Sequence, residues 1–181
     1  MKIGALSITT TALVLAGLSG MAHAQRWRAT DDIARYEDYL QEALPKAETF
    51  RFIDHGTPHY RGYKLGPNGE ETLVGLGFFT VDFARDVRGY KGEIWMLVGM
   101  DPGGTLIDIS IVYHDEPFGY FSIDPPEFIE QFRGKSVLAP MTVGQDIDGV
   151  SRATITNNAA VRSIRDSARR MAREFLTERS K

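Results

Sequence analysis

A loop passes into a long amphipathic helix at Asp148-Gly149-Val150-Ser151-Arg152-Ala153-Thr154-Ile155-Thr156, where small and hydroxyl-bearing side chains are crowded together. The first backbone N–H groups of a helix have no partner within the helix, so a phosphate is well held in front of them. A threonine hydroxyl at this place can hydrogen-bond a phosphate or carry one as an ester. The alternative is a helix cap, in which Thr156 or Asn157 satisfies these donors without any ligand.

The helix that follows is predicted over residues 157–176. Its apolar side chains recur three and four positions apart and form one stripe for packing on a core: Val161, Ile164, Ala168, Met171 and Phe175. Four arginines lie largely off this stripe: Arg162, Arg165, Arg169 and Arg173. We expect them on a solvated face, with a helix that binds a membrane surface or an acidic partner as the alternative. Arg169→Ala should then change the free energy of unfolding by less than about 0.5 kcal/mol.

Upstream of this stretch, the sequence predicts a helix and four strands. The helix is expected over 30–44 and is ended by Pro45. The strands are expected over 48–54, 72–80, 92–100 and 105–114. Gly75 and Gly77 lie within the second of these strands and permit a bulge or a close approach of another segment.

The last two strands form a predicted hairpin around Asp101-Pro102-Gly103-Gly104, a strong turn signal. In the second strand of the hairpin, Ile107 and Ile109 alternate with Asp108 and Ser110, which indicates an antiparallel sheet with one solvated face. A short helix follows over 124–132. The order of elements predicts an α+β fold, with an antiparallel sheet and flanking helices in a single domain.

Residues 1–24 have the form of a secretory signal peptide. Lys2 is followed by an apolar run over residues 3–18 and by Ala22-His23-Ala24, a small-x-small cleavage site. We expect cleavage after Ala24 and export to the periplasm, with an uncleaved membrane anchor as the alternative. Residues 25–88 would then supply the N-terminal helix and strands of the same domain.

Composition excludes several classes of function. The chain has 181 residues, 43% of them apolar and 25% charged, which is the balance of one ordinary globular domain. Its net charge of −3 gives no reason to expect a nucleic-acid partner. It contains no cysteine, which excludes iron–sulfur ligation and covalent c-type haem. A redox role therefore requires a cofactor that needs no sulfur ligand.

Metal and nucleophile motifs are missing as well. Asp54, His55 and His59 have side chains that ligate metals, but Gly56 and Pro58 keep the two histidines from sharing one helical face. No Gly-x-Ser-x-Gly motif occurs after residue 24, and the chain has no Walker-type loop. We expect neither a metal site nor a hydrolase.

The pattern Asp-x-x-Ser-x-Ala-Thr before a helix resembles the flavinylation motif of the FMN-binding domain family. That family includes the periplasmic flavin subunits of the Rnf and sodium-pumping NADH:quinone complexes and a domain of the nitrous-oxide-reduction regulator. Two more segments resemble the family in the same order: Gly89-Tyr90-Lys91-Gly92 and His114-Asp115-Glu116-Pro117. The helix over 128–134 is also similar to the one that precedes the motif. The similarity covers residues 89–172 and indicates an FMN-binding core over 89–176.

The resemblance implies that FMN is esterified through its phosphate to Thr154 by a dedicated flavin transferase. Arg152 stands where the family usually has glycine. The residues implied to form the cofactor site are Gly89, Tyr90, His114, Glu116, Pro117, Asp148, Ser151, Arg152, Ala153, Thr154 and Thr156.

Within the motif, each implied role has a plainer alternative. Ser151 is expected near the phosphate. Asp148 holds a divalent ion during attachment, or it only caps a turn. Thr156 is expected to cap or pack the start of the helix rather than to carry the flavin.

The two upstream segments also have alternatives. His114 meets the edge of the isoalloxazine ring, or it is an ordinary histidine at a strand end. Glu116 and Pro117 shape the loop beside the ring. Gly89 belongs to the site, or it only frames a turn with Gly92 because glycine tolerates a positive φ.

The resulting hypothesis is a periplasmic electron carrier with FMN covalently linked to Thr154 and no substrate turnover of its own. The flavin would do the electron chemistry while the protein positions it. Its partners would be the flavin transferase and unidentified redox donor and acceptor proteins, with a membrane complex among the candidates. The alternative is a non-redox periplasmic binding module that keeps the fold, in which Arg152 marks lost flavin attachment.

Overall fold

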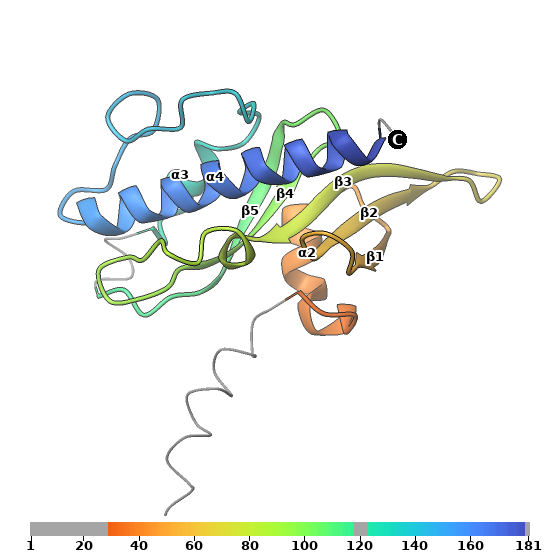
Figure 1. The fold of residues 1–181 in the computed structure, drawn as a ribbon, viewed down its shortest axis with the longest axis horizontal. Coiled ribbons are helices and arrows are strands. Elements are labelled where there is room, and N and C mark those ends of the chain that lie inside the picture. Colours follow the sequence, from red (N-terminus) through yellow and green to blue (C-terminus); the bar gives the residue numbers. More distant parts are fainter. Residues whose placement is uncertain (1–28, 118–122, 180–181) are drawn as a thin grey trace, which may run out of the picture.

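The computed structural model of the chain describes residues 29–117 and 123–179 (Figure 1). The predicted signal peptide over 1–24 lies outside these residues. The described part holds one five-stranded antiparallel sheet in the order β1-β2-β3-β4-β5, which together with the helices confirms the predicted α+β class. The elements are η1 (Ile33–Tyr36), α2 (Glu37–Ala43), β1 (Thr49–Ile53), β2 (His59–Leu65), β3 (Glu71–Phe79), η2 (Thr80–Asp82), β4 (Trp95–Met100), β5 (Leu106–Tyr113), α3 (Pro126–Glu130) and α4 (Thr154–Arg179).

One strand, β2, is not indicated by the sequence pattern. Arg61, Gly62 and Lys64 interrupt any alternation of apolar and polar side chains along it. The strand forms because β1 and β3 pair with it on both sides, with an irregularity in the pairing with β3 between Gly62 and Tyr63. Pairing with its two neighbouring strands therefore stabilises β2, although its own sequence pattern does not indicate a strand.

β4 is buried on both faces, because helices cover both sides of the sheet. Met96 and Val98 belong to the larger core cluster, which includes the apolar stripe of α4. Trp95 and Leu97 belong to a smaller cluster that includes residues of η1 and α2. Figure 1 shows the C-terminal part of α4 lying across the sheet.

The same arrangement corrects the expectation that one face of β5 is solvated. Ser110 is 1% exposed, and its hydroxyl donates a hydrogen bond to the carboxylate of Glu42 in α2. The polar residue alternates as predicted, but α2 lies against β4 and β5 and covers it. A hydrogen bond across the helix–sheet contact satisfies the polar group.

α2 approaches the sheet where glycines replace side chains. A Cβ atom added to Gly99 would lie 1.9 Å from the carbonyl oxygen of Ala43, and one added to Gly75 would lie 2.6 Å from the side chain of Leu44. Neither distance is sterically allowed. We call Gly75, Gly77 and Gly99 the glycine-lined face of the sheet. The close approach predicted at Gly75 and Gly77 is confirmed.

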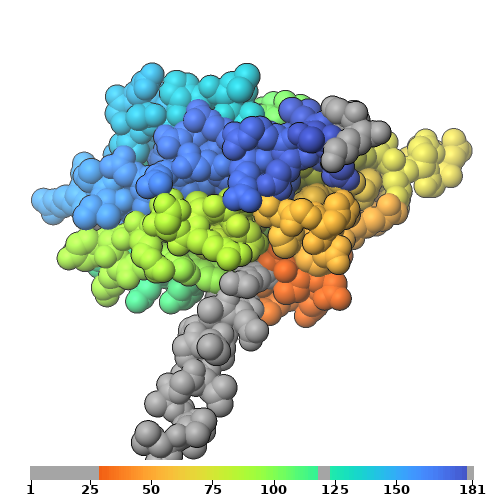
Figure 2. Space-filling view, in the orientation of Figure 1, coloured from red at the N-terminus to blue at the C-terminus, as the bar shows by residue number. Residues whose placement is uncertain are grey.

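The last helix, α4, begins at Thr154 rather than at 157. The apolar stripe predicted for it is confirmed, since every member is buried: Val161, Ile164, Ala168, Met171 and Phe175. Figure 2 shows the helix (blue) running between the loop that precedes it (cyan) and the segment around residues 80–94 (green). Within residues 29–117 and 123–179, no helix is both long and apolar enough for a membrane span.

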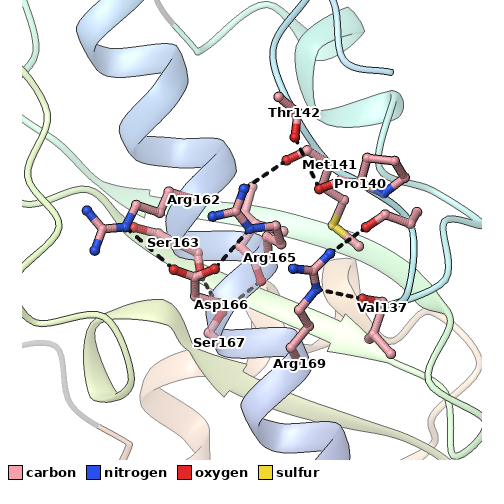
Figure 3. A network of polar contacts seen from close by, with 12 residues as sticks. Val137, Pro140, Met141, Thr142, Arg162, Ser163, Arg165, Asp166, Ser167 and Arg169 are labelled. Carbon is pink, nitrogen blue, oxygen red and sulfur yellow. Dashed lines mark hydrogen bonds and ion pairs between the residues drawn. The ribbon is translucent and has the colours of Figure 1, made fainter. Parts of the chain in front are cut away.

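Two of the α4 arginines bind the loop over 137–141 and do not simply face solvent (Figure 3). Arg169 donates from Nε to the carbonyl of Val137 at 2.9 Å and from a terminal nitrogen to the carbonyl of Ala139 at 2.7 Å. Arg165 reaches the carbonyl of Met141 at 3.5 Å. The expectation that Arg169 lies on a solvated face is therefore wrong, and we now expect a larger effect of Arg169→Ala, because the substitution leaves two loop carbonyls without their donors.

Candidate functional site

A cavity of about 560 Å³ opens at the N-terminal end of α4. Its lining combines residues from all three sequence segments that resemble the FMN-binding domain: Tyr90, Lys91, Pro117, Arg152, Ala153, Thr154, Ile155 and Thr156. The volume lies within the range of roughly 300 to 1,000 Å³ that is usual for small-molecule sites. Segments far apart in the chain thus meet at one place where a cofactor can bind.

Backbone donors at the start of α4 face this place without a cap. Asn157 is the first residue of the helix whose N–H has an acceptor in the described part of the chain, the carbonyl of Ala153 at 2.8 Å. Thr154, Ile155 and Thr156 precede it. Ala153, directly before the helix, has no polar side chain that could cap these donors. Such a helix start favours an anion through its free N–H groups and its dipole.

Both residues proposed as the cap bind elsewhere. The hydroxyl of Thr156 donates to the carboxylate of Glu116, and the side-chain amide of Asn157 donates to the carbonyl of Val150 at 2.8 Å. The capping alternative is therefore wrong, although Thr156 does pack the helix start because it is 4% exposed. The hydroxyl of Thr154, by contrast, is on an exposed residue that lines the cavity.

Arg152 has a φ of 70°, in the left-handed region of the backbone map. A residue with a Cβ atom pays about 1–2 kcal/mol for this conformation, and glycine does not. The geometry explains why a glycine would suit this position. The arginine side chain is exposed and lines the cavity, so its charge lies beside the helix start.

Glu116 is a buried carboxylate that joins two sides of the site. It accepts hydrogen bonds from the backbone N–H groups of Tyr90 and Lys91, each at 2.9 Å, and from the hydroxyl of Thr156. Burial opposes ionisation, but these hydrogen bonds outweigh it and hold the pKa of Glu116 below its usual value. A Cβ atom on Gly89 would lie 2.4 Å from this carboxylate. Glycine is needed there for close approach and not only for a turn.

His114 lies beside Glu116 but is not among the residues that line the cavity. Its Nε2 lies 2.7 Å from a carboxylate oxygen of Asp124, and its Nδ1 accepts the backbone N–H of Glu116 at 3.2 Å. Because Nδ1 accepts this hydrogen bond, Nε2 is the ring nitrogen that donates to Asp124. Both ring nitrogens are engaged within the protein, and contact with a ring edge of the cofactor stays a prediction.

The residue that directly follows α3, Gln131, holds the start of the motif loop at Asp148 in place. The side chain of Gln131 accepts the backbone N–H of Asp148 at 2.6 Å and donates to its carbonyl at 3.1 Å. Asp148 and Ser151 are both exposed, and neither lines the cavity. Their expected roles toward an ion and a phosphate stay predictions.

The two histidines considered as metal ligands each contact another group of the protein. His59 is buried, its Nδ1 bonds the carbonyl of Thr57 at 2.9 Å, and burial lowers its pKa. His55 lies 3.5 Å from the carboxylate of Glu178. Among residues 29–117 and 123–179, no three His, Asp or Glu side chains are placed to hold a metal ion.

Sequence reasoning missed two residues of the cavity wall, Lys91 and Ile155. Lys91 lies inside the first of the three resembling segments, and its positive charge was the available signal. Ile155 is 56% exposed and is flanked by two threonines that differ in burial. Its position between Thr154 and Thr156 could have indicated an apolar wall beside the Thr154 hydroxyl.

Comparison with known proteins decides the family. The model of the FMN-binding domain matches residues 89–169. The chain is also 33% identical over 174 residues to the subunit designated G in the proton-translocating ferredoxin:NAD(+) oxidoreductase complex of Clostridium ljungdahlii, covering 89% of this chain and 88% of that one. This chain belongs to the FMN-binding domain family.

Two further family relatives are more distant, and both are the subunits of the same designation in their complexes. One comes from the Na(+)-translocating ferredoxin:NAD(+) oxidoreductase complex of Acetobacterium woodii and is 24% identical over 179 residues, or 90% of this chain and 82% of that one. The other comes from an ion-translocating oxidoreductase complex of Vibrio parahaemolyticus. It is 28% identical over 123 residues, which cover 62% of this chain and 54% of that one.

The residues around the cavity fit FMN. The uncapped N–H groups from Thr154 onward, together with Arg152 and Lys91, provide positive charge suited to a phosphate. Tyr90 and Ile155 add exposed apolar surface to the same lining, as a planar aromatic ring requires. The lining thus combines positive charge for the anionic phosphate of FMN with apolar surface for its ring.

Proposed function

We propose that this protein is a periplasmic electron-transfer flavoprotein that carries FMN through a phosphoester on Thr154. The observation that carries the proposal is the difference between the two threonines at the start of α4. Thr154 is exposed and lines the cavity, whereas Thr156 is buried with its hydroxyl bonded to Glu116. A transferase needs access to the hydroxyl that it esterifies, and of these two threonines Thr154 offers it.

The protein's part in the chemistry is to bind and orient the cofactor. FMN supplies the electron chemistry when it is bound. The N–H groups at the start of α4 hold the phosphate, and the positive end of the helix dipole adds to their attraction. Lys91 and Arg152 add positive charge to the lining of the cavity, which favours additional negative charge on the flavin. Covalent attachment prevents loss of the cofactor in a compartment that does not make it.

The partners proposed for this chain follow from its relatives and its N-terminus. The relatives in Clostridium ljungdahlii, Acetobacterium woodii and Vibrio parahaemolyticus are named as subunits of oxidoreductase complexes. We infer that this chain exchanges electrons with donor and acceptor proteins of a membrane complex and is matured by a flavin transferase. Residues 1–24 direct export, with cleavage after Ala24. The periplasmic protein should begin at Gln25, and an intact Met1 in the membrane fraction would contradict this.

Covalent attachment is tested by co-expression with a flavin transferase. Wild-type protein should give a band that stays fluorescent after denaturing electrophoresis, and its intact mass should increase by one FMN less one water. Thr154→Ala should lose both signals while its melting temperature stays close to that of the unloaded wild type. Thr156→Ala is the matched control and should still carry flavin at the end point, because its hydroxyl is buried.

Two outcomes decide against the proposal. If Thr154→Ala still carries covalent flavin, the attachment site is misassigned. If the wild type never gains the mass of FMN, the carrier proposal fails. The protein is then a non-redox binding module of the same fold, in which Arg152 at the glycine position marks the loss of attachment.

A further inference from the structure

Glu116 contacts the two walls of the cavity at once. One wall is the turn at Tyr90 and Lys91, whose N–H groups each lie 2.9 Å from a different carboxylate oxygen of Glu116. The other wall is the first turn of α4, where the hydroxyl of Thr156 donates to the same carboxylate. These segments are separated by more than sixty residues in the sequence, and Glu116 lies between them in the chain.

The groups that contact Glu116 favour the ionised form of its carboxylate. Every group bonded to it is a donor, and a carboxylate only accepts. Such charge-assisted bonds are about twice as strong as neutral ones. Glutamine at this position would turn one of its own NH₂ donors toward another donor. The side chain is also 7% exposed, so water does not readily replace a lost partner.

Gly89 shows how closely this carboxylate is packed against the turn. The place of a Cβ atom on Gly89 is already filled by the Glu116 carboxylate, at 2.4 Å. The turn itself closes with a hydrogen bond from the N–H of Gly89 to the carbonyl of Gly92 at 2.7 Å. The carboxylate therefore meets a preformed turn and fixes where it lies relative to α4.

We propose that Glu116 is a positioning residue that holds the turn at Tyr90 and Lys91 at a fixed separation from the start of α4 before any flavin is attached. This inference rests on the proposed attachment at Thr154. Because the hydroxyl of Thr156 is bound to Glu116, the first turn of α4 cannot rotate without breaking a buried bond. Thr154 and its free N–H groups are thus presented to the opposite wall in the geometry that a bound phosphate and ring require. Such preorganisation lowers the ordering cost of binding.

The test compares four variants with the wild type. Glu116→Gln removes the charge, and Thr156→Val removes only the bond to α4. Thr156→Ser keeps the hydroxyl and should restore wild-type behaviour. Asp115→Asn makes the same carboxylate-to-amide change on the exposed neighbouring residue and serves as the matched control.

The first measurement is amide hydrogen exchange of Tyr90 and Lys91 in the protein without flavin. We expect exchange at least about tenfold faster in Glu116→Gln, the factor that corresponds to about 1.4 kcal/mol. Asp115→Asn and Thr156→Ser should exchange like the wild type. This measurement needs no cofactor, so it tests the link between the walls even if flavin attachment fails.

The second measurement is the single-turnover rate of covalent loading by a purified transferase. Glu116→Gln and Thr156→Val should load about tenfold more slowly than the wild type, and Thr156→Ser at the wild-type rate. Wild-type exchange and loading in a folded Glu116→Gln protein would overturn the proposal. Faster exchange with an unchanged loading rate would also overturn it, since Glu116 would then join the walls without positioning Thr154. If Glu116→Gln does not fold, Thr156→Val decides by its loading rate, and loading at the wild-type rate would overturn the proposal. A wild type that never loads refutes the proposed function instead.

Discussion

Arg169→Ala tests the contact between α4 and the loop over 137–141. The guanidinium donates to the carbonyls of Val137 and Ala139 at 2.9 and 2.7 Å. Hydrogen bonds from a charged donor contribute roughly 1.5–3 kcal/mol each to stability. Arg169 is only half-buried, so water compensates part of the loss. We expect the free energy of unfolding to fall by about 2 kcal/mol, which corresponds to a decrease in melting temperature of about 4–8 °C.

Urea unfolding, followed by far-ultraviolet circular dichroism, measures this change. The wild type and the variants are fitted with one shared dependence of the unfolding free energy on urea concentration. Arg173→Ala is the matched control, because Arg173 is exposed on the same helix and should change stability by less than about 0.5 kcal/mol. Arg169→Lys should be intermediate, since an ammonium keeps the charge but not the forked donor geometry. If Arg169→Ala and Arg173→Ala have the same unfolding midpoint, the two bonds to the loop contribute nothing and the reasoning is refuted.

Other substitutions test the site and the core. Arg152→Gly removes about 1–2 kcal/mol of strain from the left-handed backbone conformation. It also costs about 0.5–1 kcal/mol of stability, because glycine has more conformational freedom in the unfolded chain. It should raise the urea midpoint slightly and leave flavin loading at least as fast, whereas Arg152→Ala should bring no such gain. The lowered pKa of Glu116 stabilises the fold fully above its ordinary value of 4.5, and this stabilisation is lost as the pH falls through the lowered value. The stability difference between wild type and Glu116→Gln should therefore shrink below pH 4.5, and a difference that grows on acidification would contradict the assignment. Phe175→Asp buries a carboxylate at a cost of several kcal/mol and should unfold or aggregate the protein, which a normal melting curve would disprove.

Features that depend on neighbours in the sequence could be predicted. The buried stripe of α4 follows from helical periodicity, and the hairpin between β4 and β5 follows from Asp101-Pro102-Gly103-Gly104. The three motif segments do meet at one cavity. Their meeting could be expected only from their joint resemblance to one family, because no local pattern states which loops converge.

Features that depend on distant partners could not be predicted. Thr156 was expected to cap or pack the start of its helix; it packs there, but its hydroxyl binds Glu116, which lies 40 residues away. Arg169 finds its acceptors about thirty residues upstream, in a loop without a periodic pattern. A side chain with several available partners is assigned correctly only when the tertiary contacts are known.

The glycine-lined face has a consequence for how α2 ends. Ala43 is the last residue of that helix, and carbonyls at a helix end have no N–H partner within the helix. Its oxygen lies 1.9 Å from where a Cβ atom of Gly99 would be, so the α-hydrogen of Gly99 points at this oxygen. A Cα–H···O contact of this kind contributes about 0.5–1 kcal/mol. β4 thus caps the C-terminal end of α2 through a C–H group of Gly99. Replacing glycine by alanine, often a route to a more stable protein, would here remove the cap and displace the helix that it holds.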